Sequence, residues 1–185
     1  GVTVYATVDG QNYPVTINNG VGTLTVSDLI VDSYAVEVQF PGNDNYSSVE
    51  TIKYGSIIVK RATVDVTVGN VVVTRPATGT IVFTASAPGE YVVKVGDDEY
   101  PVTVQVAGVP VEIPVASMLA GSYDVKVTAD ETQNYEAVNE TFTAAYVVLK
   151  RNLTIEATPN ATEIAYGEEI TLDHSISAPE GAVLT

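Results

Sequence analysis

The sequence predicts an all-β protein built from tandem β-sandwiches, and three observations support this prediction. Apolar and polar side chains alternate along short runs such as Tyr34–Phe40, Val64–Val68 and Tyr123–Ala129. A period of two is typical of strands that bury one face in an antiparallel sheet. Turn residues separate the runs, and similar runs return in the same order about 90 residues later. No stretch has the apolar stripe that an amphipathic helix requires.

The repeat is clearest where each unit ends. Ser56–Arg61 returns as Tyr146–Arg151, and Asn45-Tyr46 returns as Asn134-Tyr135. Similarity at a fixed period indicates a tandem array of one structural unit. A repeated unit without a reactive cluster of side chains favours a building element over an active site.

Strand patterns fill one complete period between residues 62 and 151. We expect seven strands there, at about 62–74, 78–87, 90–96, 99–106, 109–115, 121–129 and 137–150. Seven short antiparallel strands in this length predict an immunoglobulin-like sandwich of two packed sheets. The chain has no Cys and no Trp. The core must therefore consist of Val, Ile, Leu, Tyr and Ala.

Turn residues mark where the strands end. Asp9-Gly10 lies between two strand patterns and is the strongest hairpin signal in the chain. Asn18-Asn19-Gly20 precedes the next expected strand. The matching segments Pro41–Asn45 and Asp130–Asn134 lie before the last strand of each unit.

The repeat divides the chain into three parts. Residues 1–61 are expected to supply the last five strands of a sandwich, residues 62–151 a complete sandwich, and residues 152–185 the first two strands of a further one. Joining the end of the sequence to its start gives one uninterrupted unit. Our hypothesis is that the chain is one period of a longer head-to-tail array.

An incomplete sandwich cannot bury its inner face, so residues 1–61 need strands from elsewhere. The preceding segment of the same polypeptide could supply them. Alternatively, residues 152–185 of another copy could do so by donor-strand complementation, which joins separate subunits into a filament. A third possibility is that the chain is an arbitrary excerpt.

Composition excludes several classes of function. The net charge is −15, from 23 acidic and 8 basic residues, which argues against nucleic acid as a partner. Without Cys there is no disulfide framework and no thiolate metal site. No apolar run approaches the ~20 residues of a membrane span. No signal peptide is recognised at Gly1.

Several short motifs recur in both units and carry a resemblance. They are Ser-Ala-Pro at 86–88 and 177–179, Asp9-Gly10 against Asp97-Asp98, Tyr13 and Tyr100, Ser-Tyr at 33–34 and 122–123, and Gly42–Tyr46 against Asn134-Tyr135. With these motifs the chain resembles the prokaryotic Ig-like repeats of large adhesin-like surface proteins of bacteria and methanogenic archaea. The second unit departs from the Asp-Gly and Gly-Asn-Asp-Asn forms and is a diverged copy.

That resemblance implies a non-catalytic stalk or fibre on the outside of a prokaryotic cell. The implied partners are copies of the same unit placed head to tail, with a host-cell or glycan ligand also possible. A carbohydrate- or protein-binding module is the competing interpretation. It would need an exposed aromatic platform, whereas the tyrosines at matched positions in both units are expected to pack as scaffold residues.

Candidate site residues are few. Four sequons make Asn45, Asn139, Asn152 and Asn160 candidates for N-glycosylation. The acidic turns at 43–45, 97–99 and 130–131 lack the spacing of a calcium loop, and we expect solvated turns there. His174 is the single His, so no nucleophile–base pair that needs a second His or a Cys can be assembled. We expect no enzyme activity and no catalytic, cofactor-binding or metal-binding residue.

Overall fold

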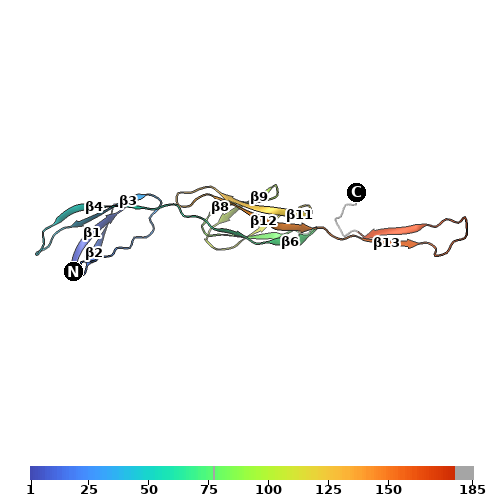
Figure 1. Ribbon diagram of the computed structural model, residues 1–185, viewed down its shortest axis with the longest axis horizontal. Coiled ribbons are helices and arrows are strands. Elements are labelled where there is room, and N and C mark those ends of the chain that lie inside the picture. The colour runs from blue at the N-terminus through green and yellow to red at the C-terminus, as the bar shows by residue number, and fades with distance from the viewer. Residues whose placement is uncertain (77, 178–185) are drawn as a thin grey trace. The chain divides into compact units, whose positions relative to one another are not determined.

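The computed structural model describes residues 1–76 and 78–177, and these residues form fourteen β-strands (Figure 1). None of the described residues forms a helix that could cross a membrane. The strands are β1 (Val2–Val8), β2 (Gln11–Ile17), β3 (Ser33–Phe40), β4 (Val49–Ile58), β5 (Val66–Val68), β6 (Val71–Thr74), β7 (Thr80–Ala85), β8 (Gly89–Val95), β9 (Asp98–Val104), β10 (Val111–Pro114), β11 (Gly121–Ala129), β12 (Val138–Leu149), β13 (Thr154–Pro159) and β14 (Leu172–Ser177).

The chain folds into two units. The first contains Gly1–Val64 together with the segment Asp130–Ala137. The second contains Asp65–Ala129 and the chain from Val138 onward. The loop between β11 and β12 is therefore grouped with the first unit.

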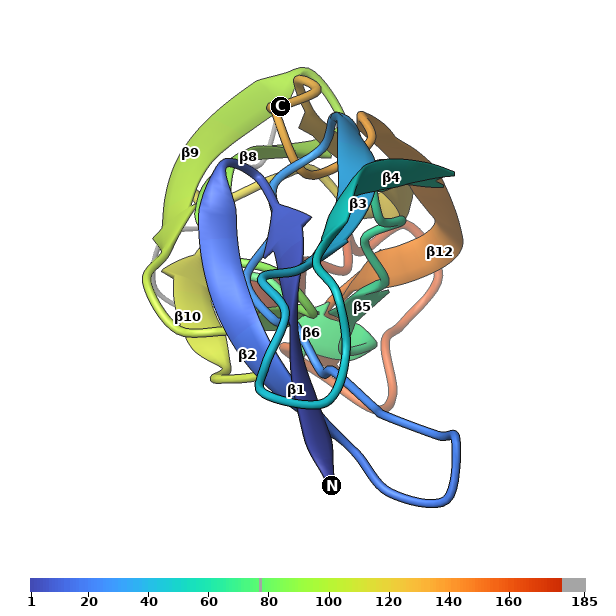
Figure 2. The ribbon, with the colours of Figure 1, turned by 90° about the vertical axis from the view of Figure 1, so that its left-hand side faces the viewer.

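One antiparallel sheet forms the first unit, with the strand order β2-β1-β3-β4 (Figure 2). Its buried side chains are Ala6, Val8, Val15 and Tyr34. All ten residues of β4 are exposed. The side chains of β1 are thus partly buried, whereas those of β4 are exposed.

The hairpin between β1 and β2 confirms the prediction from Asp9-Gly10. Val8 pairs with Gln11, so Asp9 and Gly10 alone form the turn. Their φ angles are 52° and 69°. A two-residue hairpin turn of type I′ requires positive φ at both positions, and Asp-Gly tolerates this well.

The second unit contains two sheets in a sandwich-like arrangement. One has the order β10-β7-β5 and the other the order β6-β12-β11-β8-β9. Phe83 of β7 and Tyr91 of β8 pack across the two sheets, with ring centroids 5.3 Å apart and the rings tilted by 59°. The side chains that are 0 % exposed come from both sheets: Ile81, Phe83, Ala85, Val93, Val95, Val125 and Val127. The expectation of a core made of Val, Ile, Leu, Tyr and Ala alone was wrong, because the Phe83 ring is fully buried and packs against Tyr91.

Residues 62–74 form two strands where we expected one. β5 pairs antiparallel with β7, whereas β6 pairs parallel with β12 in the other sheet. Gly69 and Asn70 separate them, and the Gly69 N–H still donates to the Val82 carbonyl at 2.9 Å. Because the segment changes sheets at this point, residues 65–151 form eight strands rather than seven.

Residues 1–61 form four strands rather than the expected five. The missing strand would follow Asn18-Asn19-Gly20, and its counterpart in the second unit is β10. The ladder partner of β10 is β7. No described strand of the first unit corresponds to β7, so residues 22–26 have no ladder partner and stay outside the sheet.

Residues 152–177 form an antiparallel pair of strands, β13 and β14, with Thr154 opposite Ser177 and Pro159 opposite Leu172. All six residues of β13 are exposed. Among the described strands, this pair has no further neighbour in its sheet. The Ala-Pro part of the motif at 177–179 lies outside the described residues.

Candidate functional site

The four glycosylation candidates are all exposed. Asn45 lies in the loop between β3 and β4, and Asn139 lies on β12 opposite Thr128. Asn152 lies between β12 and β13, and Asn160 directly follows β13. The four positions lie on four different segments of the chain.

Asn160 has a structural role as well as a sequon. Its side-chain carbonyl accepts a hydrogen bond from the Thr171 N–H at 3.1 Å, and its own N–H donates to the Thr171 carbonyl at 3.0 Å. These bonds fix the end of the β13–β14 pair. The amide nitrogen that a glycan would use takes part in neither of them.

The acidic turns considered for calcium make contacts of their own. The Asn43 side-chain oxygen accepts hydrogen bonds from the N–H groups of Asn45 and Tyr46, each at 2.9 Å. Glu99 lies 3.4 Å from Lys94, and Glu131 lies 3.6 Å from Arg61. No three His, Asp or Glu side chains of the described residues come together in a group that could hold a metal ion.

His174 lies on β14, where its backbone pairs with Ala157. Its side chain is outside the part of the chain that the structure describes.

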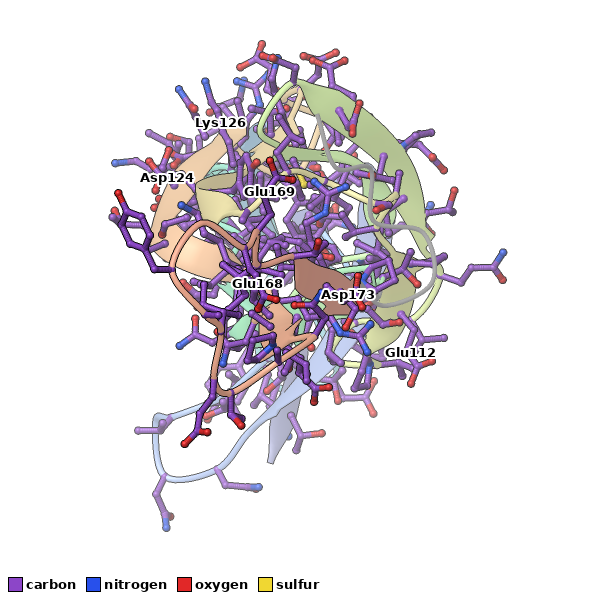
Figure 3. The ribbon with its side chains drawn as sticks, turned by 90° about the vertical axis from the view of Figure 1, so that its right-hand side faces the viewer. Glu112, Asp124, Lys126, Glu168, Glu169 and Asp173 are labelled. Carbon is purple, nitrogen blue, oxygen red and sulfur yellow. The ribbon has the colours of Figure 1, made fainter. Side chains whose placement is uncertain are left out.

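Charged side chains lie on the outer faces of the strands and in the loops. Asp124 and Lys126 project outward from β11, and Glu168 and Glu169 come from the loop between β13 and β14 (Figure 3). The Asp124 carboxylate accepts a hydrogen bond from the Ala144 N–H at 2.8 Å, where Ala144 has a φ of 53°. This carboxylate stabilises an irregular point of β12 and is thus part of the scaffold.

A tyrosine at one matched position makes the same contact in both units. The Tyr34 hydroxyl donates to the Ile30 carbonyl at 2.8 Å, and the Tyr123 hydroxyl donates to the Leu119 carbonyl at 2.9 Å. Each acceptor lies four residues before its tyrosine. This confirms the expectation that this pair of tyrosines serves the scaffold.

The second matched loop has one backbone geometry in both copies. The Asn43 N–H donates to the Tyr46 carbonyl at 2.9 Å, and the Thr132 N–H donates to the Tyr135 carbonyl at 2.9 Å. A side-chain oxygen of the first residue accepts the tyrosine N–H in each case. The two loops are therefore built alike, although only Asn45-Tyr46 and Asn134-Tyr135 match in sequence.

Within the first unit, the 132–136 loop binds the residues that lead toward β5. The Ala62 N–H donates to the Asn134 carbonyl at 2.9 Å, and the Glu136 N–H donates to the Ala62 carbonyl at 3.0 Å. Arg61 Nε donates to the Thr132 carbonyl at 2.8 Å. We call this set of contacts the Arg61–Ala62 clamp.

The clamp was not among the sites expected from the sequence. Two signals could have indicated it: Lys-Arg and Asn-Tyr both recur with almost the same spacing. Tyr46 also differs from the expectation of core or corner packing, since it is 62 % exposed. Tyr135, which forms a β-bridge with Ala62, is half-buried.

The chain was also compared with known proteins. It matches no protein-family model and no curated protein sequence.

Proposed function

We propose that this chain is a non-catalytic structural repeat of a stalk or fibre on the outside of a prokaryotic cell, built from Ig-like sandwiches placed head to tail. The observation that carries the proposal is the repetition of contacts. Tyr34 and Tyr123 make the same hydrogen bond, and the loops at 43–46 and 132–135 close in the same way. The contacts that recur in both units, about 90 residues apart, are contacts that hold the scaffold together.

The topology of the second unit supports the Ig-like assignment. A first strand that divides between two sheets, as β5 and β6 do, suits a sandwich whose sheets are linked at their edge. Tyr123 lies near the start of β11 and bonds to a carbonyl four residues upstream. Such a tyrosine corner occurs in Ig-type sandwiches at the corresponding strand.

Surface chemistry supports an exported protein. All four sequon asparagines are exposed, and an exposed Asn is where a glycan is tolerated. A net charge of −15 favours solubility and opposes random association of neighbouring molecules.

Labelling of cells that produce the protein tests the proposal. Antibodies against the chain should label intact, unpermeabilised cells, and denaturing gels of the labelled fraction should show whether the copies are covalently joined. One very large polypeptide indicates an array, and a band near 19.5 kDa indicates separate subunits. Label that is seen only after permeabilisation contradicts a surface stalk. Specific binding of the 185-residue chain on a glycan array would favour the binding-module alternative.

A further inference from the structure

We propose that the open apolar face of the first unit is completed by the β13–β14 pair of a second copy of this chain, with residues 22–26 pairing with β14. This inference rests on the proposed head-to-tail function and names the surface that joins one copy to the next.

The segment 22–26 has the pattern of a strand without a partner. Its counterpart β10, 89 residues later, pairs with β7 and places Ile113 and, just beyond its end, Val115 in the core at 4 % and 2 % exposure. The matching residues Leu24 and Val26 are half-buried, while their neighbours are exposed. The segment therefore has the alternation of a strand, but no described strand of the first unit lies beside it as β7 lies beside β10.

Beside this segment the first unit has an open cavity of about 690 Å³. Eight of its ten lining residues are aliphatic, and they include Ala6, Val8, Leu24, Val26, Val36 and Ile57. In the second unit the corresponding inner face is covered by the sheet that contains β5 and β7. Apolar surface of this kind is stabilised by burial against a second sheet.

The β13–β14 pair corresponds to β5 and β7 of the next unit. It follows the Lys-Arg of 150–151 as β5 follows the Lys-Arg of 60–61, and the Ser-Ala-Pro at its end matches the one that follows β7. Ile155 and Leu172 are 67 % and 58 % exposed. The described residues therefore include a sheet without neighbours equivalent to β5 and β7, and they also include a pair of strands equivalent to these two.

The clamp provides a second and independent argument. Arg61 and Ala62, which lead toward β5, bind the 132–136 loop. Arg151 and Asn152 lead toward β13 in the same way. The loop that matches 132–135 is 43–46, and its Tyr46 is more exposed than Tyr135. Seating β13–β14 on the first unit of another copy would bring Arg151-Asn152 to that loop and cover Tyr46.

Glycans on this joint are compatible with the proposal. Asn45 and Asn152 correspond to Asn134 and Ala62, which remain exposed although their backbones are paired. Both sequons could therefore carry sugar while the joint is formed.

The known register predicts which residues meet. In the second unit Glu112 pairs with Val82 and Ile113 pairs with Ile81. Transferred by the repeat, Thr23 lies opposite Asp173, and Leu24 lies opposite Leu172. Opposed residues in an antiparallel ladder have Cα atoms ~4.5–5.5 Å apart, which suits a disulfide.

Disulfide cross-linking between full-length chains tests this register, since the natural chain has no Cys. Thr23→Cys and Asp173→Cys chains, one of them carrying a size tag, are mixed at high protein concentration and oxidised. About 0.5 M NaCl is included to shorten the Debye length to a few ångströms and screen the acidic chains. Both sites are exposed, so both variants should fold. The expected product is the heterodimer on a non-reducing gel.

Thr16→Cys mixed with Asp173→Cys is the matched control. Thr16 is exposed on β2, a free edge strand of the sheet in the first unit. The Thr23 mixture should give at least about tenfold more heterodimer than this control. Equal yields from the two mixtures, or no heterodimer from either, would overturn the proposal.

A chain carrying both Thr23→Cys and Asp173→Cys tests the competing occupant. Head-to-tail joining predicts a ladder of linked oligomers. An intramolecular disulfide that leaves a monomer would show that the chain folds back on itself, and would overturn joining between copies. Surface label on intact cells combined with failed cross-linking rejects the joint and keeps the stalk. Successful cross-linking of a protein found only inside cells rejects the stalk alone.

Discussion

Within the described residues, five tyrosine hydroxyl groups form hydrogen bonds that hold loops to strands. Tyr34, Tyr91 and Tyr123 each donate to a carbonyl four residues upstream. Tyr100 and Tyr146 instead accept a backbone N–H, from Ala116 and Gly79 respectively. A tyrosine can fill the core with its ring and satisfy a backbone group with its hydroxyl, which suits a chain that lacks Cys and Trp.

Replacing Tyr146 with Phe should destabilise the second unit more than replacing Tyr123 with Phe. The Tyr146 hydroxyl is the acceptor of the buried Gly79 N–H at 3.0 Å, and Tyr146 is 1 % exposed. Loss of a buried partner costs about 1–3 kcal/mol, whereas loss of an exposed hydrogen bond such as that of Tyr123 costs about 0.5–1.5 kcal/mol. Denaturant unfolding of the two variants measures the difference. Equal losses would contradict this account.

Alkaline pH should weaken the first unit through Tyr34. Burial raises the pKa of Tyr34 above its ordinary value of 10.0, and the carboxylates of Asp9 and Asp32 add to the shift. The unfolded chain therefore loses this proton at a lower pH than the folded chain. The stabilisation is complete below about pH 10 and disappears as the pH rises through the folded pKa.

Unfolding of the wild type and of Tyr34→Phe, followed as a function of pH, checks this prediction. The variant cannot ionise at this position, so its stability should fall less steeply above pH 10. Identical pH profiles would show that Tyr34 does not contribute.

At the scale of the elements, a strand forms only where a ladder partner exists. Residues 111–114 and 22–25 lie at matched positions, yet only the first segment is a strand, because β7 lies beside it. β4 and β12 also correspond, but β4 is exposed throughout, whereas β12 contributes Ala145, Tyr146 and Val148 to the core. Neighbouring sheets, rather than the segment's own pattern, decide whether an apolar residue is buried.

Truncation of two isoleucines should show the same contrast in stability. Ile81 on β7 is 0 % exposed and Ile155 on β13 is 67 % exposed. Ile81→Ala should cost about 2–5 kcal/mol, because it removes buried methyl groups and leaves a cavity. Ile155→Ala should change stability by about 0.5 kcal/mol or less at low protein concentration. Chemical denaturation measures both, and a large loss for Ile155→Ala would mean that β13 is already covered in solution.

At the scale of the whole molecule, acidic charge dominates. The chain carries 23 acidic and 8 basic residues. The described residues contain the ion pairs Lys53–Glu37, Arg61–Glu131 and Lys94–Glu99, whose side chains are between 31 % and 80 % exposed. Ion pairs that are open to solvent contribute little to stability. Solvent and salt must therefore screen most of the repulsion between the acidic side chains.

Added salt should therefore raise the thermal stability of the chain. Moving from about 0.01 M to 0.5 M NaCl shortens the Debye length from ~30 Å to a few ångströms and screens repulsion between the carboxylates. We expect the main melting transition to rise by a few degrees, as about 1 kcal/mol would produce in a chain of this size. Calorimetry at several salt concentrations measures the shift, and a fall in the melting temperature would contradict it.

The sequence by itself determined the strand class, the position of most strands and the Asp9-Gly10 turn. These depend on local properties, namely the two-residue period and the backbone angles that Asp and Gly tolerate. It also determined that Tyr34 and Tyr123 are equivalent, because the repeat places them at the same position.

Only the tertiary structure decided the change of sheet at Gly69-Asn70, the unpaired state of residues 22–26, and the Arg61–Ala62 clamp. Each depends on which segments lie beside one another after folding. The glycosylation candidates could be identified from their motif, whereas their exposure could not. A strand's own residues determine its propensity to form a strand. Its neighbours in space supply the hydrogen-bond partners and the apolar surface that complete it.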